Sequence, residues 1–108
     1  MNQNQATPIP ANDQTFEHYA NAFKALSDPK RLKLLHELCN KGQVCVCDLC
    51  EIMELPQSKL SYHLKILLDA ELISQEKKGK WNYYELNQNE VNHLLSPELC
   101  CLFRPTSC

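Results

Sequence analysis

Residues 57–68 read QSKLSYHLKILL, and this stretch decides the fold. Its leucines recur at intervals of three and four, which is the spacing of one face of an α-helix. These leucines are Leu60, Leu64, Leu67 and Leu68. The opposite face carries polar and basic side chains. The pattern therefore predicts a helix that buries one stripe in a core and presents the other face to its surroundings.

Two helices are predicted before this stretch. Apolar residues at helical spacing run over residues 15–26, and Thr15 is expected to be the N-cap. A second helix is expected to begin at Pro29, capped by Ser27 or Asp28. Its inner face is expected to consist of Leu32, Leu35, Leu38 and Cys39.

Shorter elements surround the central helix. Residues 44–46 predict a short strand, and residues 47–53 predict a short helix. Residues 73–78 and 81–86 are rich in β-branched and aromatic residues and flank Gly79, which predicts a β-hairpin.

A last helix over residues 88–95 completes the order. Helix, helix, short strand, helix, helix, hairpin and helix indicate a mainly α fold with a small β-hairpin wing, the winged helix-turn-helix. The second helix of the central pair would enter a DNA major groove. We expect a flexible N-terminal arm at 1–13, the winged helix-turn-helix domain at 14–96 and a cysteine-containing tail at 97–108.

Composition is that of one compact domain. The chain has 108 residues, of which 44% are hydrophobic. Its net charge of −2 argues weakly against a nucleic-acid partner, but residues 57–80 hold five lysines against three acids.

No apolar run approaches the roughly 20 residues that span a bilayer, and residues 1–13 lack the regions of a signal peptide. We therefore expect a cytoplasmic protein with no membrane partner.

The candidate DNA-binding residues lie on the polar face of the central helix and on the hairpin. Gln57 pairs well with adenine, and the lysines suit phosphate or guanine. The alternative is an ordinary solvated helix face. His36 is expected to be a packing residue, and His63 is expected on the DNA side. The full set is Gln57, Ser58, Lys59, Ser61, Tyr62, His63, Lys65, Lys77, Lys78 and Lys80.

Three of the seven cysteines stand close together in QVCVCDLC, residues 43–50. Along a strand Cys45 and Cys47 would point to the same side. If Cys47 caps the next helix, Cys50 would converge on them, and the helix N-terminus would lower the thiol pKa. Three thiolates without a fixed fourth ligand suit As(III) or Sb(III) better than zinc. The alternatives are buried apolar cysteines and a reversible disulfide.

The tail offers a second candidate triad, Cys100, Cys101 and Cys108. It is the better candidate for a methylated arsenical, which needs only two thiols. A tail cysteine could also supply a fourth ligand for zinc, cadmium or lead. The alternative is a disordered tail with exposed thiols.

Four motifs together resemble the ArsR/SmtB metal-responsive repressors. They are ALSDPKRLKLLHEL (25–38), CVCDLC (45–50), QSKLSYHLKILLDAELI (57–73) and KKGKWNYYEL (77–86), and they cover about residues 15–95. CVCDLC resembles the arsenic-sensing branch in particular. The resemblance implies a homodimer, joined through its first and last helices, that binds operator DNA of an arsenic-resistance operon when inducer-free. It implies release of the DNA when As(III) or Sb(III) binds to cysteine thiolates, with no organic cofactor.

Other functions remain open at this point. A winged-helix repressor could sense cadmium, lead, zinc or thiol oxidation instead. Some members of the family bind zinc through their last helix, but here that helix offers only Glu90 and His93. With only two glycines, the chain has no P-loop-like phosphate cradle, so we expect no enzyme activity.

Overall fold

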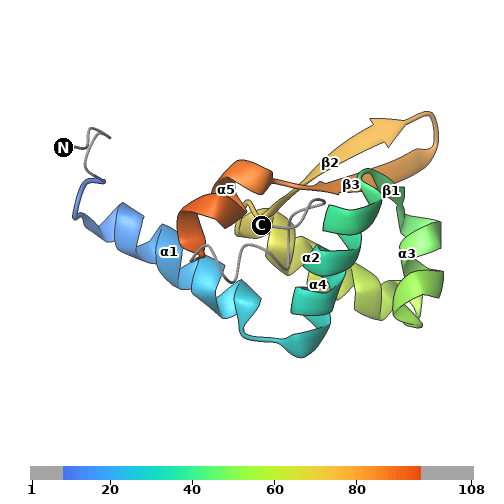
Figure 1. Ribbon diagram of the computed structural model, residues 1–108, viewed down its shortest axis with the longest axis horizontal. Helices are drawn as coiled ribbons and strands as arrows, with labels where there is room; N and C mark the ends of the chain where they lie inside the picture. The colour runs from blue at the N-terminus through green and yellow to red at the C-terminus, as the bar shows by residue number, and fades with distance from the viewer. Residues whose placement is uncertain (1–8, 96–108) are drawn as a thin grey trace.

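The computed structural model describes residues 9–95 and confirms the predicted mainly α fold with a hairpin wing (Figure 1). In chain order the elements are α1 (Asp13–Leu26), α2 (Pro29–Lys41), β1 (Val44–Cys45), α3 (Val46–Met53), α4 (Gln57–Asp69), β2 (Ile73–Lys78), β3 (Trp81–Leu86) and α5 (Gln88–Leu94). Helix α1 extends to one side with α5 beside it, and the wing projects at the opposite end.

The core forms where α4 packs against its neighbours. Leu60, Leu64 and Leu67 are buried as the leucine stripe predicts, and Leu68 is half-buried. They join one apolar cluster with residues of α2, α3, the wing and α5. Burial of this stripe turns the polar face of α4 outward, which is the arrangement that a DNA-reading helix requires.

The ends of the first two helices follow ordinary capping chemistry, with one correction. The N-cap of α1 is Asn12 and not Thr15, because the Asn12 Oδ1 accepts from the Thr15 backbone N–H at 2.9 Å. The Asp28 carboxylate caps α2 by accepting from the backbone N–H groups of Lys30 and Arg31. Pro29 is the first residue of α2, as predicted.

The inner face of α2 differs from the prediction at one of the four predicted residues. Leu35, Leu38 and Cys39 are buried as expected, but Leu32 is 39% exposed and Leu34 is fully buried. The buried stripe begins at Arg31 and continues at intervals of three and four, which places Leu32 outside it.

His36 also lies outside the buried stripe of α2. It is exposed, and its Nε2 lies 3.1 Å from Asn40 Nδ2, so the predicted packing role was wrong.

The wing belongs to a three-stranded antiparallel sheet in the order β1-β3-β2. Lys78 pairs with Trp81, which leaves a two-residue turn that begins at Gly79 with φ +64. The sequence did not predict that β1 would join this sheet. Cys45 is paired with Tyr83 of β3, so the cysteine motif is attached directly to the wing.

Strand β1 is also shorter than expected. Val46 is the first residue of α3 and not the last of the strand.

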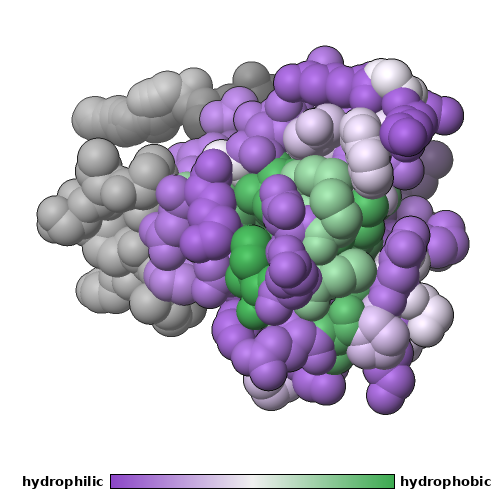
Figure 2. Space-filling model, turned by 90° about the vertical axis from the view of Figure 1, so that its right-hand side faces the viewer, coloured by the Kyte–Doolittle hydropathy of each residue, from purple (hydrophilic) through white to green (hydrophobic). Residues whose placement is uncertain are grey.

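Partly exposed apolar side chains of α3 include Val46, Cys50 and Ile52. Figure 2, which views the molecule from the side that carries α3, shows apolar surface framed by hydrophilic side chains.

None of the helices between residues 9 and 95 is both long enough and apolar enough to cross a membrane.

The burial of Leu34 and the exposure of Leu32 predict different effects of substituting them. Leu34→Ala is expected to lower the free energy of unfolding by about 2–5 kcal/mol, because it opens a cavity in a closed core. Leu32→Ala on the same helix is the matched control and should change it far less. Urea denaturation at a fixed protomer concentration measures both. Equal losses would contradict the assignment of Leu32 to the outer face.

Candidate nucleic-acid interface and thiol pair

The outer face of α4 presents the predicted DNA-binding side chains. All of them except His63 are exposed: Gln57, Ser58, Lys59, Ser61, Tyr62 and Lys65. Lys65 forms a solvent-exposed ion pair with Asp69 at 3.3 Å. Such pairs contribute roughly 0–1 kcal/mol, so Lys65 can exchange this partner for a phosphate at small cost.

His63 is half-buried and has a partner inside the protein. Its Nδ1 lies 3.1 Å from Nη1 of Arg31. A guanidinium only donates, so His63 Nδ1 accepts and the imidazole is neutral with its hydrogen on Nε2. Burial lowers the pKa of His63, and the positive charges of Arg31 and Lys30 lower it further against the opposing effect of Asp28.

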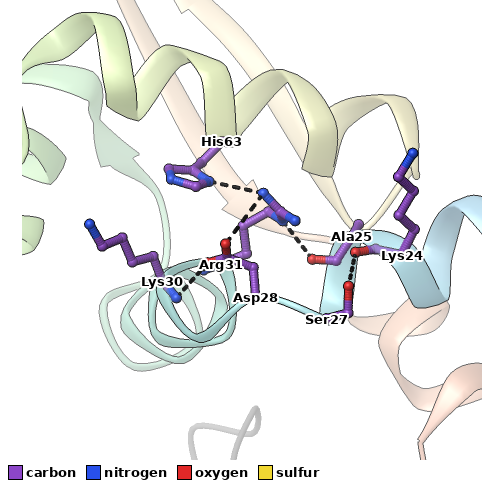
Figure 3. Close-up of polar contacts among 7 residues, drawn as sticks. All are labelled: Lys24, Ala25, Ser27, Asp28, Lys30, Arg31 and His63. Carbon is purple, nitrogen blue, oxygen red and sulfur yellow. Dashed lines mark hydrogen bonds and ion pairs between the residues drawn. The ribbon is translucent and has the colours of Figure 1, made fainter.

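Arg31 connects three parts of the domain (Figure 3). Its side chain is only 10% exposed. Nε donates to the carbonyl oxygen of Ala25 at the end of α1 over 2.7 Å, and Nη1 lies 3.9 Å from Asp28 Oδ2 and 3.1 Å from His63 of α4. The guanidinium therefore fixes α4 relative to the junction of α1 and α2.

Asp28 is held in its charged form by the same cluster. Burial alone would raise the pKa of Asp28, but hydrogen bonds from two backbone N–H groups and the charge of Arg31 bring it below its ordinary value. Sequence reasoning missed Arg31. The available signal was a charged residue in phase with the buried leucines of α2, three positions after an acidic cap.

The wing lysines are exposed, and two of them are oriented by neighbours. Lys78 Nζ donates to Gln43 Oε1 at 2.6 Å and lies 5.3 Å from the centre of the Tyr83 ring. Lys80 Nζ lies at the same distance over Trp81. Lys77 is exposed as well. The wing thus presents a positive edge suited to phosphate.

Cys45 and Cys47 form a thiol pair, with 2.8 Å between their sulfur atoms. This is longer than the roughly 2.05 Å of a disulfide, and both cysteines are free. The N-cap of α3 is Cys45 and not Cys47 as predicted, because the helix already begins at Val46. Cys45 is buried and Cys47 is exposed.

Cys50 does not join the pair. It is half-buried and packs against the apolar core. Within residues 9–95, no three His, Cys, Asp or Glu side chains lie close enough together to hold a metal ion. The predicted convergence of three thiols is therefore present only for Cys45 and Cys47. Cys100, Cys101 and Cys108 lie outside the described residues.

The pKa of Cys47 differs from the expectation. The hydrogen bond to Cys45 raises the pKa of Cys47, and desolvation and the nearby Asp48 act in the same direction. For Cys47 the predicted lowering of the pKa was wrong, because these contacts outweigh the hydrogen bond from the Asp48 backbone N–H at the start of α3. Burial raises the pKa of Cys39, which packs in the core as expected.

A cavity of about 420 Å³ lies beside the thiol pair. Its walls include Gln43, Cys45 and Ile52, and Tyr83 of the wing.

On the other side of the molecule, Glu90 of α5 lies 3.7 Å from His18 of α1.

Comparison with known proteins gives concordant matches. Residues 28–75 match the model of "Bacterial regulatory protein, arsR family". The chain is 66% identical over 86 residues to the arsenical resistance operon repressor of Bacillus subtilis, covering 80% of this chain and 82% of the relative.

Solved structures share the fold. The transcriptional repressor PagR of Bacillus anthracis superposes with a TM-score of 0.66 at 28% identity, covering 77% of this chain and 94% of PagR. A homodimeric winged helix-turn-helix domain from Mycobacterium bovis superposes with a TM-score of 0.68 at 21% identity, covering 83% and 82% of the two chains.

The exposure of the thiols predicts their relative reactivity. We expect iodoacetamide to modify Cys47 much faster than Cys39, because Cys47 is exposed while Cys39 is buried in the core. Mass spectrometry of the digested protein resolves the two sites. Faster modification of Cys39 would contradict the placement of these two side chains.

Proposed function

Because this chain belongs to the ArsR family of bacterial regulatory proteins, we propose that it represses an arsenic-resistance operon by binding operator DNA and releases the DNA on binding As(III) or Sb(III). The family consists of DNA-binding regulators and not of enzymes. We place its action in the cytoplasm, where operator DNA lies. The observation that carries the inducer proposal is the thiol pair of Cys45, on the strand that joins the wing, and Cys47, in the first turn of α3.

The DNA-binding part of the proposal rests on two exposed surfaces. The outer face of α4 would enter the major groove and read bases with Gln57 and the serines Ser58 and Ser61. The wing lysines would contact the phosphate backbone or the minor groove. Because these contacts neutralise phosphates, we expect operator affinity to fall with salt, with a slope of about −4 to −8 for a dimer.

Self-association is proposed through α1 and α5. Phe16 and Phe23 stand seven positions apart on α1, on the same side of the helix, and are 60% and 55% exposed. Two large aromatic side chains exposed on one helix mark an interaction surface. The contact of Glu90 with His18 fixes α5 beside that helix. A second copy of the chain would cover this face and set the distance between the two recognition helices.

Release by the inducer is proposed to act through β1. The Cys45 and Cys47 thiols would each replace one hydroxyl group of As(OH)3, forming an As–S bond and releasing a water molecule, and Cys50 would have to turn out of the core to give the third sulfur. Cys45 is both the partner of Tyr83 in the sheet and the N-cap of α3. Pulling it toward a third thiol would therefore disturb the wing and the helix that precedes α4.

Two alternatives compete with induction through Cys45, Cys47 and Cys50. The tail triad Cys100, Cys101 and Cys108 could hold the inducer, whether inorganic or methylated, or add a ligand for cadmium, lead or zinc. A thiol-oxidation switch is a second candidate function, favoured by the 2.8 Å separation of the Cys45 and Cys47 sulfurs. Peroxide would then release DNA where arsenite would not.

Serine substitutions separate the two thiol sites. Cys45→Ser and Cys47→Ser are expected to retain operator affinity and to lose release by arsenite, because the DNA surfaces are untouched while the sulfur ligands are gone. Fluorescence anisotropy of a labelled operator duplex measures both, with titrations of As(III), Sb(III), methylarsenite, Cd(II), Zn(II) and peroxide.

The controls for that titration are Cys39→Ala and the double variant Cys100→Ser, Cys101→Ser. Both should still release DNA with arsenite. Loss of release in the tail variant, with full release in Cys45→Ser, would assign induction to the tail. If peroxide released the DNA from every variant and arsenite released it from none, neither cysteine triad would be favoured as a metalloid site.

The aromatic face of α1 predicts the oligomeric state. The double variant Phe16→Ala, Phe23→Ala is expected to weaken the dimer and, with it, operator binding, because α1 loses its largest exposed apolar side chains. Sedimentation equilibrium measures the dimer. Leu32→Ala, another exposed apolar position, is the matched control. An unchanged dimer in the double variant would exclude this face.

A further inference from the structure

We propose that the cavity between the start of α2 and the recognition helix α4 binds a phosphate of the operator backbone, with Lys30 of α2 as a DNA contact. This proposal rests on the proposed DNA-binding function. It adds a contact from a helix that the sequence did not assign to DNA. The cavity measures about 490 Å³.

The walls of this cavity are rich in hydrogen-bond donors. Lys30 stands on the α2 side, and Ser58, Lys59 and Tyr62 stand on the α4 side. Their side chains offer two ammonium groups and two hydroxyl groups. All four residues are exposed, so an ion as large as phosphate can reach them.

The one acid in the wall, Asp28, is ionised and already paired within the protein. Its carboxylate accepts from the backbone N–H groups of Lys30 and Arg31 and lies 3.9 Å from the Arg31 guanidinium. Two lysines in the wall and Arg31 behind it thus face a single carboxylate, which leaves the cavity positive. The site does not use the backbone of the α2 N-terminus, because Asp28 already caps it.

His63 supplies a fixed neutral donor in the same wall. Its Nδ1 is occupied by Arg31, so the ring hydrogen sits on Nε2 and is available to an acceptor. The charged and titratable groups around the ring are Asp28, Lys30 and Arg31 from the α2 side and Tyr62 from α4. Arg31 therefore acts as a positioning residue, because its guanidinium is anchored to the end of α1 and holds the imidazole through its Nη1 (Figure 3).

The place of the cavity favours a backbone phosphate over a base. In helix-turn-helix complexes the recognition helix occupies the groove, while other parts of the domain, such as the loop between the first two helices of a homeodomain, contact the flanking backbone. This cavity opens along the side of α4 that faces α2, so a phosphate at the groove edge would lie between the two helices. A contact of this kind positions the protein without reading sequence.

The test compares two lysines of α2. Lys30→Gln removes the wall residue, and Lys33→Gln removes an exposed lysine three positions along that does not line the cavity. Affinities for the operator and for a scrambled duplex are measured across a series of salt concentrations. Lys30→Gln should weaken both duplexes by the same factor and reduce the salt slope by about 0.9 per protomer. Lys33→Gln should leave the slope at the wild-type value.

Lys30→Arg keeps the charge and should restore the slope, which separates loss of a phosphate contact from loss of folding. Identical slopes for Lys30→Gln and Lys33→Gln, with wild-type protein bound to the operator, would overturn this proposal and leave the proposed function intact. A wild-type protein that bound neither duplex would overturn the proposed function itself.

Discussion

Burial of one leucine stripe of α4 is the constraint on which the rest of the structure depends. Leu60, Leu64 and Leu67 are closed off from solvent, and a helix with one face buried can turn only the opposite face outward. That face carries Gln57, Lys59 and Tyr62. In an isolated peptide these side chains would have no fixed orientation relative to the rest of the domain. Packing against the core is therefore what presents them together on one outward surface.

The orientation of α4 is fixed at two further points, and both lie at the edges of the core. On one side Arg31 joins His63 to the end of α1, the helix whose aromatic face is proposed to meet a second copy of the chain. On the other side α3 leads from the thiol pair into the turn before α4. The recognition helix therefore sits between the proposed dimer contact and the proposed inducer site, so a shift at either one can reach the DNA surface.

Periodicity predicted the order of the elements and the buried stripe of α4, because those signals extend over many residues. It failed where one tertiary contact decides the outcome. Leu32 and Leu34 differ by two positions, and the choice between them follows from the inward Arg31, whose partners lie on α1 and α4. The pairing of Cys45 with Tyr83 joins residues 38 positions apart, which local spacing cannot reveal. The cap at Cys45 follows from that pairing, since the strand ends there.

The shortness of β1 sets an energy scale for the proposed release of DNA. Its pairing with β3 spans two residues, Val44 and Cys45. A backbone hydrogen bond contributes about 0.5–1.5 kcal/mol net, so the pairing of so short a strand is worth only a few kcal/mol. Coupling free energies between sites in allosteric proteins are typically about 1–3 kcal/mol. The pairing of β1 with β3 therefore falls in the range that binding of the proposed inducer could overcome. A longer β1 would lock the wing into one state.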